Sequence, residues 1–185
     1  MSYLFEPEHR TFLYLLYKYQ VDYMLIGGVA VNLYGYSRGT GDLDILFSPS
    51  DRNKQQLIFA IDEFGYDTTE FEKKSVNEIT MFTLGERTDQ GHIELTNRIA
   101  GIRYEEASLR KQQISIDGLT VSYIHYRDLL KNKQAAGRQK DLVDVKKLQQ
   151  IRRIQENYAP NENKKVSFSS LWQKLRQIIT LRKDS

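Results

Sequence analysis

The spacing of apolar residues alternates between helical and strand-like periods over the first 125 residues of the chain. Apolar side chains that recur every three to four positions predict helices over residues 7–20, 29–36, 52–64 and 104–110. Short apolar runs predict strands over residues 23–26, 43–47, 79–84, 92–95, 113–116 and 119–124. Asp117-Gly118 joins the last two strands and is typical of a hairpin turn. The pattern indicates an α+β core that begins with a helix.

Beyond residue 125 the pattern is helical. Helices are predicted over residues 126–136 and 140–155, and Gly137 separates them. Residues 157–167 are polar, and residues 168–182 have the apolar spacing of an amphipathic helix. We therefore divide the chain into a core (1–125), a helical segment packed on the core (126–156), and a linker with a C-terminal amphipathic helix (157–185). That last helix either docks on the domain or forms a homodimer, or it binds nucleic acid, a membrane surface or a partner.

Composition is typical of a globular protein, with 28% charged and 40% hydrophobic residues. No apolar run reaches the roughly 18 residues that span a bilayer, and the first residues lack the pattern of a signal peptide. The absence of cysteine excludes disulfides and thiolate metal sites, and it fits a cytoplasmic location. We expect a cytoplasmic protein that does not partner a membrane.

Charge is unevenly distributed along the chain. Residues 126–185 contain 15 Lys/Arg and 6 Asp/Glu, whereas residues 1–125 contain 12 and 18. The last third is therefore a candidate surface for phosphates or a polyanion. The alternative is that these basic helices are simply well solvated.

Two aspartates begin a predicted strand after a glycine-rich loop. Asp42 and Asp44 are separated by one residue, so their side chains point to the same face of a strand. Carboxylate oxygens suit Mg²⁺ or Mn²⁺, which proteins commonly hold with one or two carboxylates and substrate phosphates. Glu94 lies in a later apolar strand, and three carboxylates on adjacent strands can hold two divalent cations roughly 3.5–4 Å apart. We expect these three residues to be catalytic and to bind the metal, with Glu94 also a candidate base. Otherwise, Asp42 caps the loop and Glu94 forms a surface ion pair.

Glycines and polar residues around this pair are candidates for nucleotide binding. Gly27 and Gly28 follow a strand and begin a helix, where backbone N–H groups could cradle the β- and γ-phosphates. Arg38 and Thr40 stand just before the carboxylates. Arg38 either braces a triphosphate or organises the loop by hydrogen bonding to carbonyl oxygens.

The combined spacing resembles the active-site signature of a known superfamily. Gly27-Gly28-x-Ala30, followed by Gly35-x-x-Arg38-x-Thr40-x-Asp42-x-Asp44, is similar to that of the polymerase-β-like nucleotidyltransferases. The closest branch is the small prokaryotic one, with minimal nucleotidyltransferases and abortive-infection nucleotidyltransferase toxins. The resemblance implies a small mixed β-sheet flanked by helices, with a helical extension. It also implies two-metal transfer of a nucleoside monophosphate from an NTP such as ATP to a hydroxyl or phosphate.

A later run, Lys133-x-x-Ala136-Gly137-Arg138-x-Lys140-Asp141-x-x-Asp144, resembles the segment that follows the sheet in that branch. The resemblance suggests that Lys133 or Lys140 approaches the nucleotide phosphates. The spacing of Lys140 and Asp144, four residues apart, favours an ion pair between them instead. We interpret His92 and His125 as structural, because neither has a second histidine at metal-binding spacing.

Two positions differ from the pattern of the superfamily. Val29 stands where better-studied members have serine, and Glu94 stands where aspartate is usual. These differences motivate an alternative function, a catalytically silent relative that binds nucleotide or a partner, for instance as a toxin–antitoxin component. For an active enzyme, the acceptor could be RNA, a protein or a small molecule.

Overall fold

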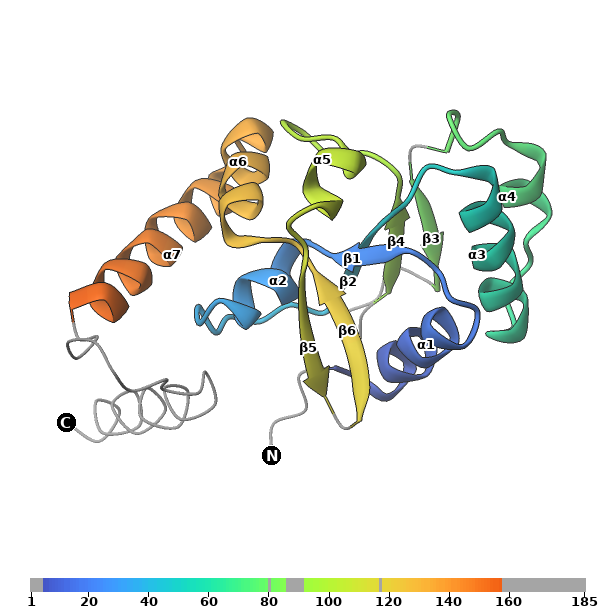
Figure 1. Ribbon diagram of the computed structural model, residues 1–185, viewed down its shortest axis with the longest axis horizontal. Helices are drawn as coiled ribbons and strands as arrows, with labels where there is room; N and C mark the ends of the chain where they lie inside the picture. Colours follow the sequence, from blue (N-terminus) through green and yellow to red (C-terminus); the bar gives the residue numbers. More distant parts are fainter. Residues whose placement is uncertain (1–4, 80, 86–91, 117, 158–185) are drawn as a thin grey trace.

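The computed structural model describes residues 5–79, 81–85, 92–116 and 118–157. Within these residues a six-stranded mixed sheet has the order β3-β4-β2-β1-β6-β5 (Figure 1). Its strands are β1 (Tyr23–Leu25), β2 (Leu43–Phe47), β3 (Phe82–Leu84), β4 (Ile93–Thr96), β5 (Gln112–Ile116) and β6 (Leu119–Tyr123). The helices are α1 (Pro7–Lys18), α2 (Gly27–Leu33), α3 (Asp51–Glu63), α4 (Thr69–Lys73), α5 (Tyr104–Ser108), α6 (Tyr126–Ala136) and α7 (Gln139–Asn157). The predicted α+β class and the mixed sheet flanked by helices are confirmed.

Alternating side chains divide the sheet between two cores. Leu25 and Ile45 pack in a core shared with α1, α3 and α4, whereas Met24 and Leu46 pack in a second core shared with α5, α6 and α7. Helix α2 contributes side chains to both cores. Asp44 stands two residues before Leu46 and therefore points to the face covered by α6 and α7. The polar end of β2 thus opens on the side where the basic helices lie.

Most predicted elements are present with small differences at their ends. The helix expected over residues 29–36 begins earlier, at Gly27, because Gly27 adopts the left-handed φ of +59° and lets the chain turn directly out of β1. Helix α4 was not predicted, since its five residues bury a single side chain, Phe71. The strand expected over residues 79–84 is observed over Phe82–Leu84, and residue 80 lies outside the described residues. The amphipathic helix expected over residues 168–182 also lies outside them.

The helical segment after the sheet is confirmed as a pair of helices. Gly137 ends α6 in the left-handed region, with a φ of +65°, and α7 begins two residues later. Helices α6 and α7 pack against one another, and α6 also contacts α2 (Figure 1). Among the described residues, no helix has the length and apolar character that crossing a bilayer requires.

His9 on α1 gives the fold an expected dependence on pH. It is only 5% exposed, and burial lowers its pKa below the ordinary 6.5, although Glu6 and Glu8 oppose the shift. The unfolded chain then binds this proton more readily. The contribution of neutral His9 to the free energy of unfolding is therefore fully present above about pH 6.5. It is lost as the pH drops, by at most about 1.4 kcal/mol per pH unit. We expect His9→Leu to flatten this part of a pH series of urea denaturation curves. Parallel curves for the two proteins would contradict the assignment to His9.

Candidate active site

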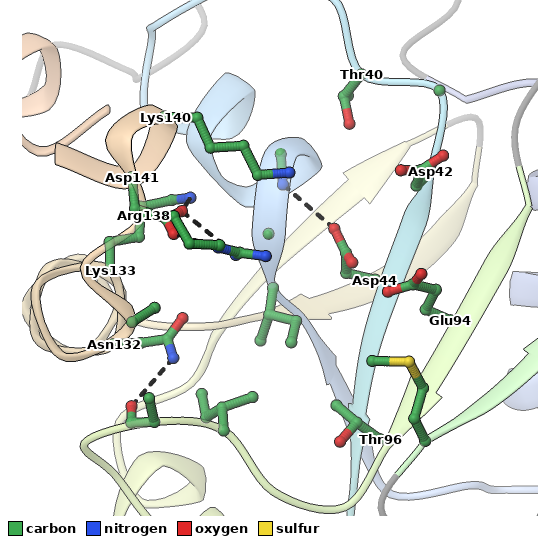
Figure 2. Close-up of a pocket in the computed structure, with 18 of the residues that line it drawn as sticks. Thr40, Asp42, Asp44, Glu94, Thr96, Asn132, Lys133, Arg138, Lys140 and Asp141 are labelled. Carbon is green, nitrogen blue, oxygen red and sulfur yellow. Dashed lines mark hydrogen bonds and ion pairs between the residues drawn. The ribbon is translucent and has the colours of Figure 1, made fainter. Parts of the chain in front are cut away.

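The parallel pairing of β2 with β4 places two of the predicted carboxylates side by side. Asp44 is the direct register partner of Glu94, so both side chains project from the same face of the sheet. Figure 2 shows Asp42, Asp44 and Glu94 together at one wall of a cavity. The expectation that Glu94 comes from a strand beside Asp44 is confirmed.

His92 connects two of these carboxylates. Its Nδ1 lies 3.2 Å from an oxygen of Asp42, and its Nε2 lies 3.0 Å from an oxygen of Glu94. The ring is 7% exposed, whereas the side chain of Asp42 is 46% exposed and that of Glu94 is 19% exposed. His125, in contrast, accepts a hydrogen bond from the backbone N–H of Arg127 at the start of α6, a structural role. The prediction that both histidines are structural thus fits His125. For His92 it missed the contacts with Asp42 and Glu94.

The two glycines at the start of α2 make room for the site. A Cβ on Gly27 would lie 1.8 Å from Asp44 Oδ2, and one on Gly28 would lie 2.3 Å from Thr40 Oγ1. The N–H of Gly28 donates to Asp44 Oδ2 at 3.4 Å. Only glycine therefore allows the carboxylate and the loop to approach the backbone this closely.

Asp44 lies in an environment that disfavours its charge. Burial raises the pKa of this carboxyl, and the charges of Glu94 and Asp42 raise it further, whereas the hydrogen bond from Gly28 lowers it. A cation beside Asp44 would offset the cost of burying its charged form and the repulsion from Glu94 and Asp42. A buried carboxyl with a raised pKa in a cavity is a candidate functional group.

A second wall of the cavity is basic and comes from α6 and α7. Lys133 is buried and contacts Asp141 Oδ1 at 2.9 Å and Asp144 Oδ2 at 2.8 Å. Arg138 donates to Asp141 Oδ2 at 2.6 Å. Burial alone would raise the pKa of Asp141, but the hydrogen bonds from Arg138 and Lys133 outweigh it and hold that pKa low. Two buried carboxylates thus fix the basic wall in place.

Lys140 does not form the ion pair with Asp144 that its spacing predicts. Asp144 is directed to Lys133 and Arg38 instead, because its side chain is buried whereas Lys140 is exposed. Lys140 makes no ion pair with the other residues that the structure describes. In Figure 2 its ammonium group points into the cavity. The prediction of an ion pair between Lys140 and Asp144 is therefore wrong.

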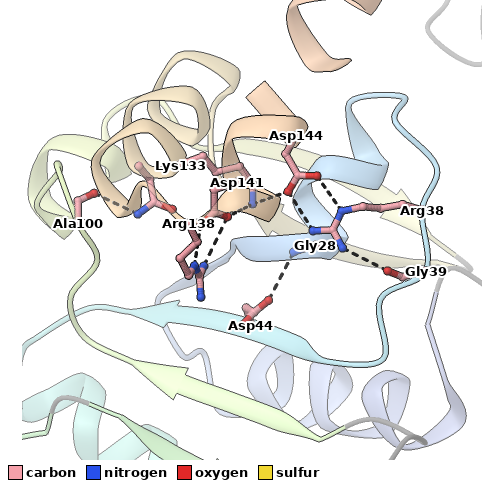
Figure 3. Close-up of polar contacts among 10 residues, drawn as sticks. Gly28, Arg38, Gly39, Asp44, Ala100, Lys133, Arg138, Asp141 and Asp144 are labelled. Atoms are coloured by element: carbon pink, nitrogen blue, oxygen red, sulfur yellow. Dashed lines mark hydrogen bonds and ion pairs between the residues drawn. The ribbon is translucent and has the colours of Figure 1, made fainter. Parts of the chain in front are cut away.

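Arg38 organises the loop before the carboxylates. Its guanidinium donates two hydrogen bonds to Asp144, at 2.8 and 3.0 Å, and a third to the carbonyl of Gly39 at 3.2 Å (Figure 3). Of the two roles that the sequence left open, this arrangement corresponds to the organisation of the loop.

The acidic and basic walls enclose one cavity of about 790 Å³, which Gly27, Gly28, Arg38, Thr40 and Lys133 also line. Among the described residues, no group of three acidic or histidine side chains is arranged to hold a metal ion by itself. A divalent cation would therefore need oxygens from a substrate to complete its shell, which is common for Mg²⁺ at phosphate-binding sites.

Comparisons with known proteins support the fold. No family model matches the chain, and a search of curated proteins finds no match. The lincosamide antibiotic adenylyltransferase LnuA superimposes with a TM-score of 0.51 and 16% identity over 80% of this chain and 98% of its own. An antigenic nucleotidyltransferase-like protein from Paracoccidioides brasiliensis (TM-score 0.46, 16% identity, 80% and 75% covered) is a more distant match. So is a Thermotoga maritima protein described as a nucleotidyltransferase (0.46, 13%, 80% and 90%).

The chain therefore has the polymerase-β-like nucleotidyltransferase fold. This fold agrees with the resemblance seen in the sequence, and the match covers 80% of the chain.

Proposed function

We propose that this protein is a metal-dependent nucleotidyltransferase that moves a nucleoside monophosphate from an NTP to a hydroxyl or phosphate acceptor and releases pyrophosphate. The observation that carries the proposal is the cavity itself. Asp44 and Glu94 pair across β2 and β4 on one wall, and Arg138 and Lys140 stand on another. Carboxylates facing cations across a cavity of this size suit a metal-bound triphosphate.

Asp42, Asp44 and Glu94 are the residues that would hold Mg²⁺ or Mn²⁺. The raised pKa of Asp44 and the proximity of Glu94 fit a cation at this wall. When bound there, the cations would neutralise the phosphates and lower the pKa of the attacking hydroxyl, as in two-metal sites. Glu94 is our candidate for the base that would accept the proton of that hydroxyl.

The basic wall and the turn at α2 would orient the triphosphate. Lys140 and Arg138 supply positive charge across the cavity from the carboxylates. The loop that carries Thr40 lies against the Gly27-Gly28 turn and narrows that side of the site. Lys133 contributes to the positive potential but is already paired with two carboxylates, so direct binding falls to Lys140.

The acceptor would be a hydroxyl or phosphate of a small molecule, an RNA or a protein. LnuA is a lincosamide antibiotic adenylyltransferase, and it provides a precedent for a small-molecule acceptor on this fold. RNA and protein acceptors remain open alternatives. We propose ATP as the first donor to test.

A second candidate function is nucleotide binding without turnover, as in a toxin–antitoxin component. The contacts of His92 with Asp42 and Glu94 favour it, because these carboxylates are already engaged within the protein. Calorimetry with a non-hydrolysable NTP and Mn²⁺ would show tight binding in both cases. Only the silent protein would bind the natural NTP tightly and form no product over hours.

Transfer can be tested with α-labelled nucleotides. We expect the protein, incubated with each α-labelled NTP, Mn²⁺ or Mg²⁺ and cell extract, to label an acceptor. The double variant Asp42→Asn with Asp44→Asn should lose this labelling, because both candidate metal ligands are neutralised. Asp62→Asn, an exposed carboxylate on α3 away from the cavity, is the matched control and should keep it. No labelled acceptor with any nucleotide, or equal labelling by the double variant, would refute the proposal.

A further inference from the structure

A network of charges around two buried carboxylates, Asp141 and Asp144, connects the loop before the acidic residues to the basic wall. It consists of Arg38, Lys133, Arg138, Asp141 and Asp144 (Figure 3). Asp144 is its centre, since it accepts from Arg38 on one side and lies 2.8 Å from Lys133 on the other. Arg38 and Asp144 are 106 residues apart, so the pair forms only when α7 packs against the site.

The loop itself has few other anchors. The side chain of Asn32 on α2 holds the backbone of Arg38 through two hydrogen bonds, of 3.0 and 3.1 Å. Next along the chain, a Cβ on Gly39 would meet nothing within 4 Å, and Thr40 then lies against Gly28. Arg38 thus holds the near end of the segment that leads through Gly41 to Asp42, and the contact with His92 and the pairing of Leu43 in β2 hold its far end.

We propose that Asp144 is a positioning residue that clamps Arg38, so that α7 sets the position of the loop and hence of Asp42. The same carboxylate, with Asp141, holds Lys133 under the basic wall. One network therefore fixes the spacing between the acidic and basic walls of the cavity. The catalytic part of this inference rests on the proposed function, whereas the position of the loop does not.

The protein contains a matched control for this clamp. Arg110 donates to Asp128 at 2.8 and 3.1 Å, and Asp128 is buried as Asp144 is. Neither member of that pair lines the cavity. Loss of either pair should destabilise the protein, but only loss of the Arg38–Asp144 pair should release the loop.

Amide hydrogen exchange tests the clamp without requiring activity. Arg38→Gln and Asp144→Asn should each speed exchange of residues 38–42 by about tenfold, and Asp128→Asn and Arg110→Gln should leave it unchanged. The effects of Arg38→Gln and Asp144→Asn on exchange should not be additive in the double variant, because each substitution breaks the same contact. If Asp144→Asn fails to fold, Arg38→Gln still tests the clamp, because the side chain of Arg38 is partly exposed and its loss should be tolerated. Unchanged exchange in Arg38→Gln, or equal acceleration by the control variants, would overturn the proposal.

Kinetics distinguish positioning from direct contact with the nucleotide. With Asp42 displaced and Lys140 still in place, Arg38→Gln should lower kcat about tenfold and leave KM for the NTP nearly unchanged. Direct binding of phosphate by Arg38 would raise KM instead, and Asp144→Asn would not reproduce that effect. A rise in KM alone would therefore overturn the positioning role. If no variant and no wild-type protein transfers nucleotide, the proposed function fails and the exchange result alone decides the clamp.

Discussion

Replacement of Asp44 by asparagine is expected to lower the rate of nucleotide transfer by roughly 100- to 1000-fold. Asp44 is paired with Glu94 across the two strands and stands at the centre of the acidic wall. Asparagine retains the shape and can still accept the hydrogen bond from Gly28, but it removes the charge that would hold the cation. The measurement is kcat for transfer of label from the α-labelled NTP that the protein uses.

The same substitution should leave the protein at least as stable as before. Burial and the charges of Glu94 and Asp42 raise the pKa of Asp44, so its ionised form costs stability near neutral pH. Removing that charge should increase the free energy of unfolding by up to about 1 kcal/mol. Asp62→Asn serves as the control, with both activity and stability near those of the wild type. An inactive Asp44→Asn protein that is also unfolded, or a folded one with full activity, would contradict this reasoning.

Gly27→Ala is expected to abolish transfer and to destabilise the protein. A left-handed φ of +59° costs an alanine about 1–2 kcal/mol. In addition, the new Cβ would lie 1.8 Å from Asp44 Oδ2, so the carboxylate must move. We expect at least a roughly 100-fold loss in kcat, similar to the loss of a catalytic contact. The measurements are the labelling rate and the unfolding free energy in urea.

Gly65→Ala separates the two causes. Gly65 also has a positive φ, of +94°, but a Cβ there would meet nothing within 4 Å. Its variant should lose stability by a similar backbone cost and keep its transfer activity. Equal loss of activity in both variants would show that backbone strain alone, and not the displacement of Asp44, disables the site.

Much of the fold could be predicted from local patterns. The strand Leu43–Phe47 and the helix Tyr126–Ala136 have the predicted ends, because apolar spacing and a terminal glycine mark them clearly. The pairing of β2 with β4 and the order of the six strands depend on tertiary packing that no local window contains. Helix α4 was missed for a related reason, since its single buried side chain leaves no periodicity to detect.

Asp42 and Asp44 could be predicted to share a face because one residue separates them, and Glu94 was expected from a later apolar strand that could run beside theirs. The basic wall could be predicted only in part. Lys140 was anticipated as a candidate, but Arg138 was not, and the partner of Arg38 lies 106 residues further along the chain. His92 was interpreted as structural because no second histidine stands at metal-binding spacing from it. Its position two residues before Glu94, directly ahead of β4, was the signal that could have found it.

The parallel pairing of β2 with β4 also couples ligand binding to folding. Asp44 and Glu94 come from segments 50 residues apart and face one another only while those strands are hydrogen-bonded. The unfolded chain has no equivalent pair of carboxylates. Any ligand that bridges the two therefore shifts the folding equilibrium toward the native state by mass action, and the concentration of free ligand sets how far it shifts.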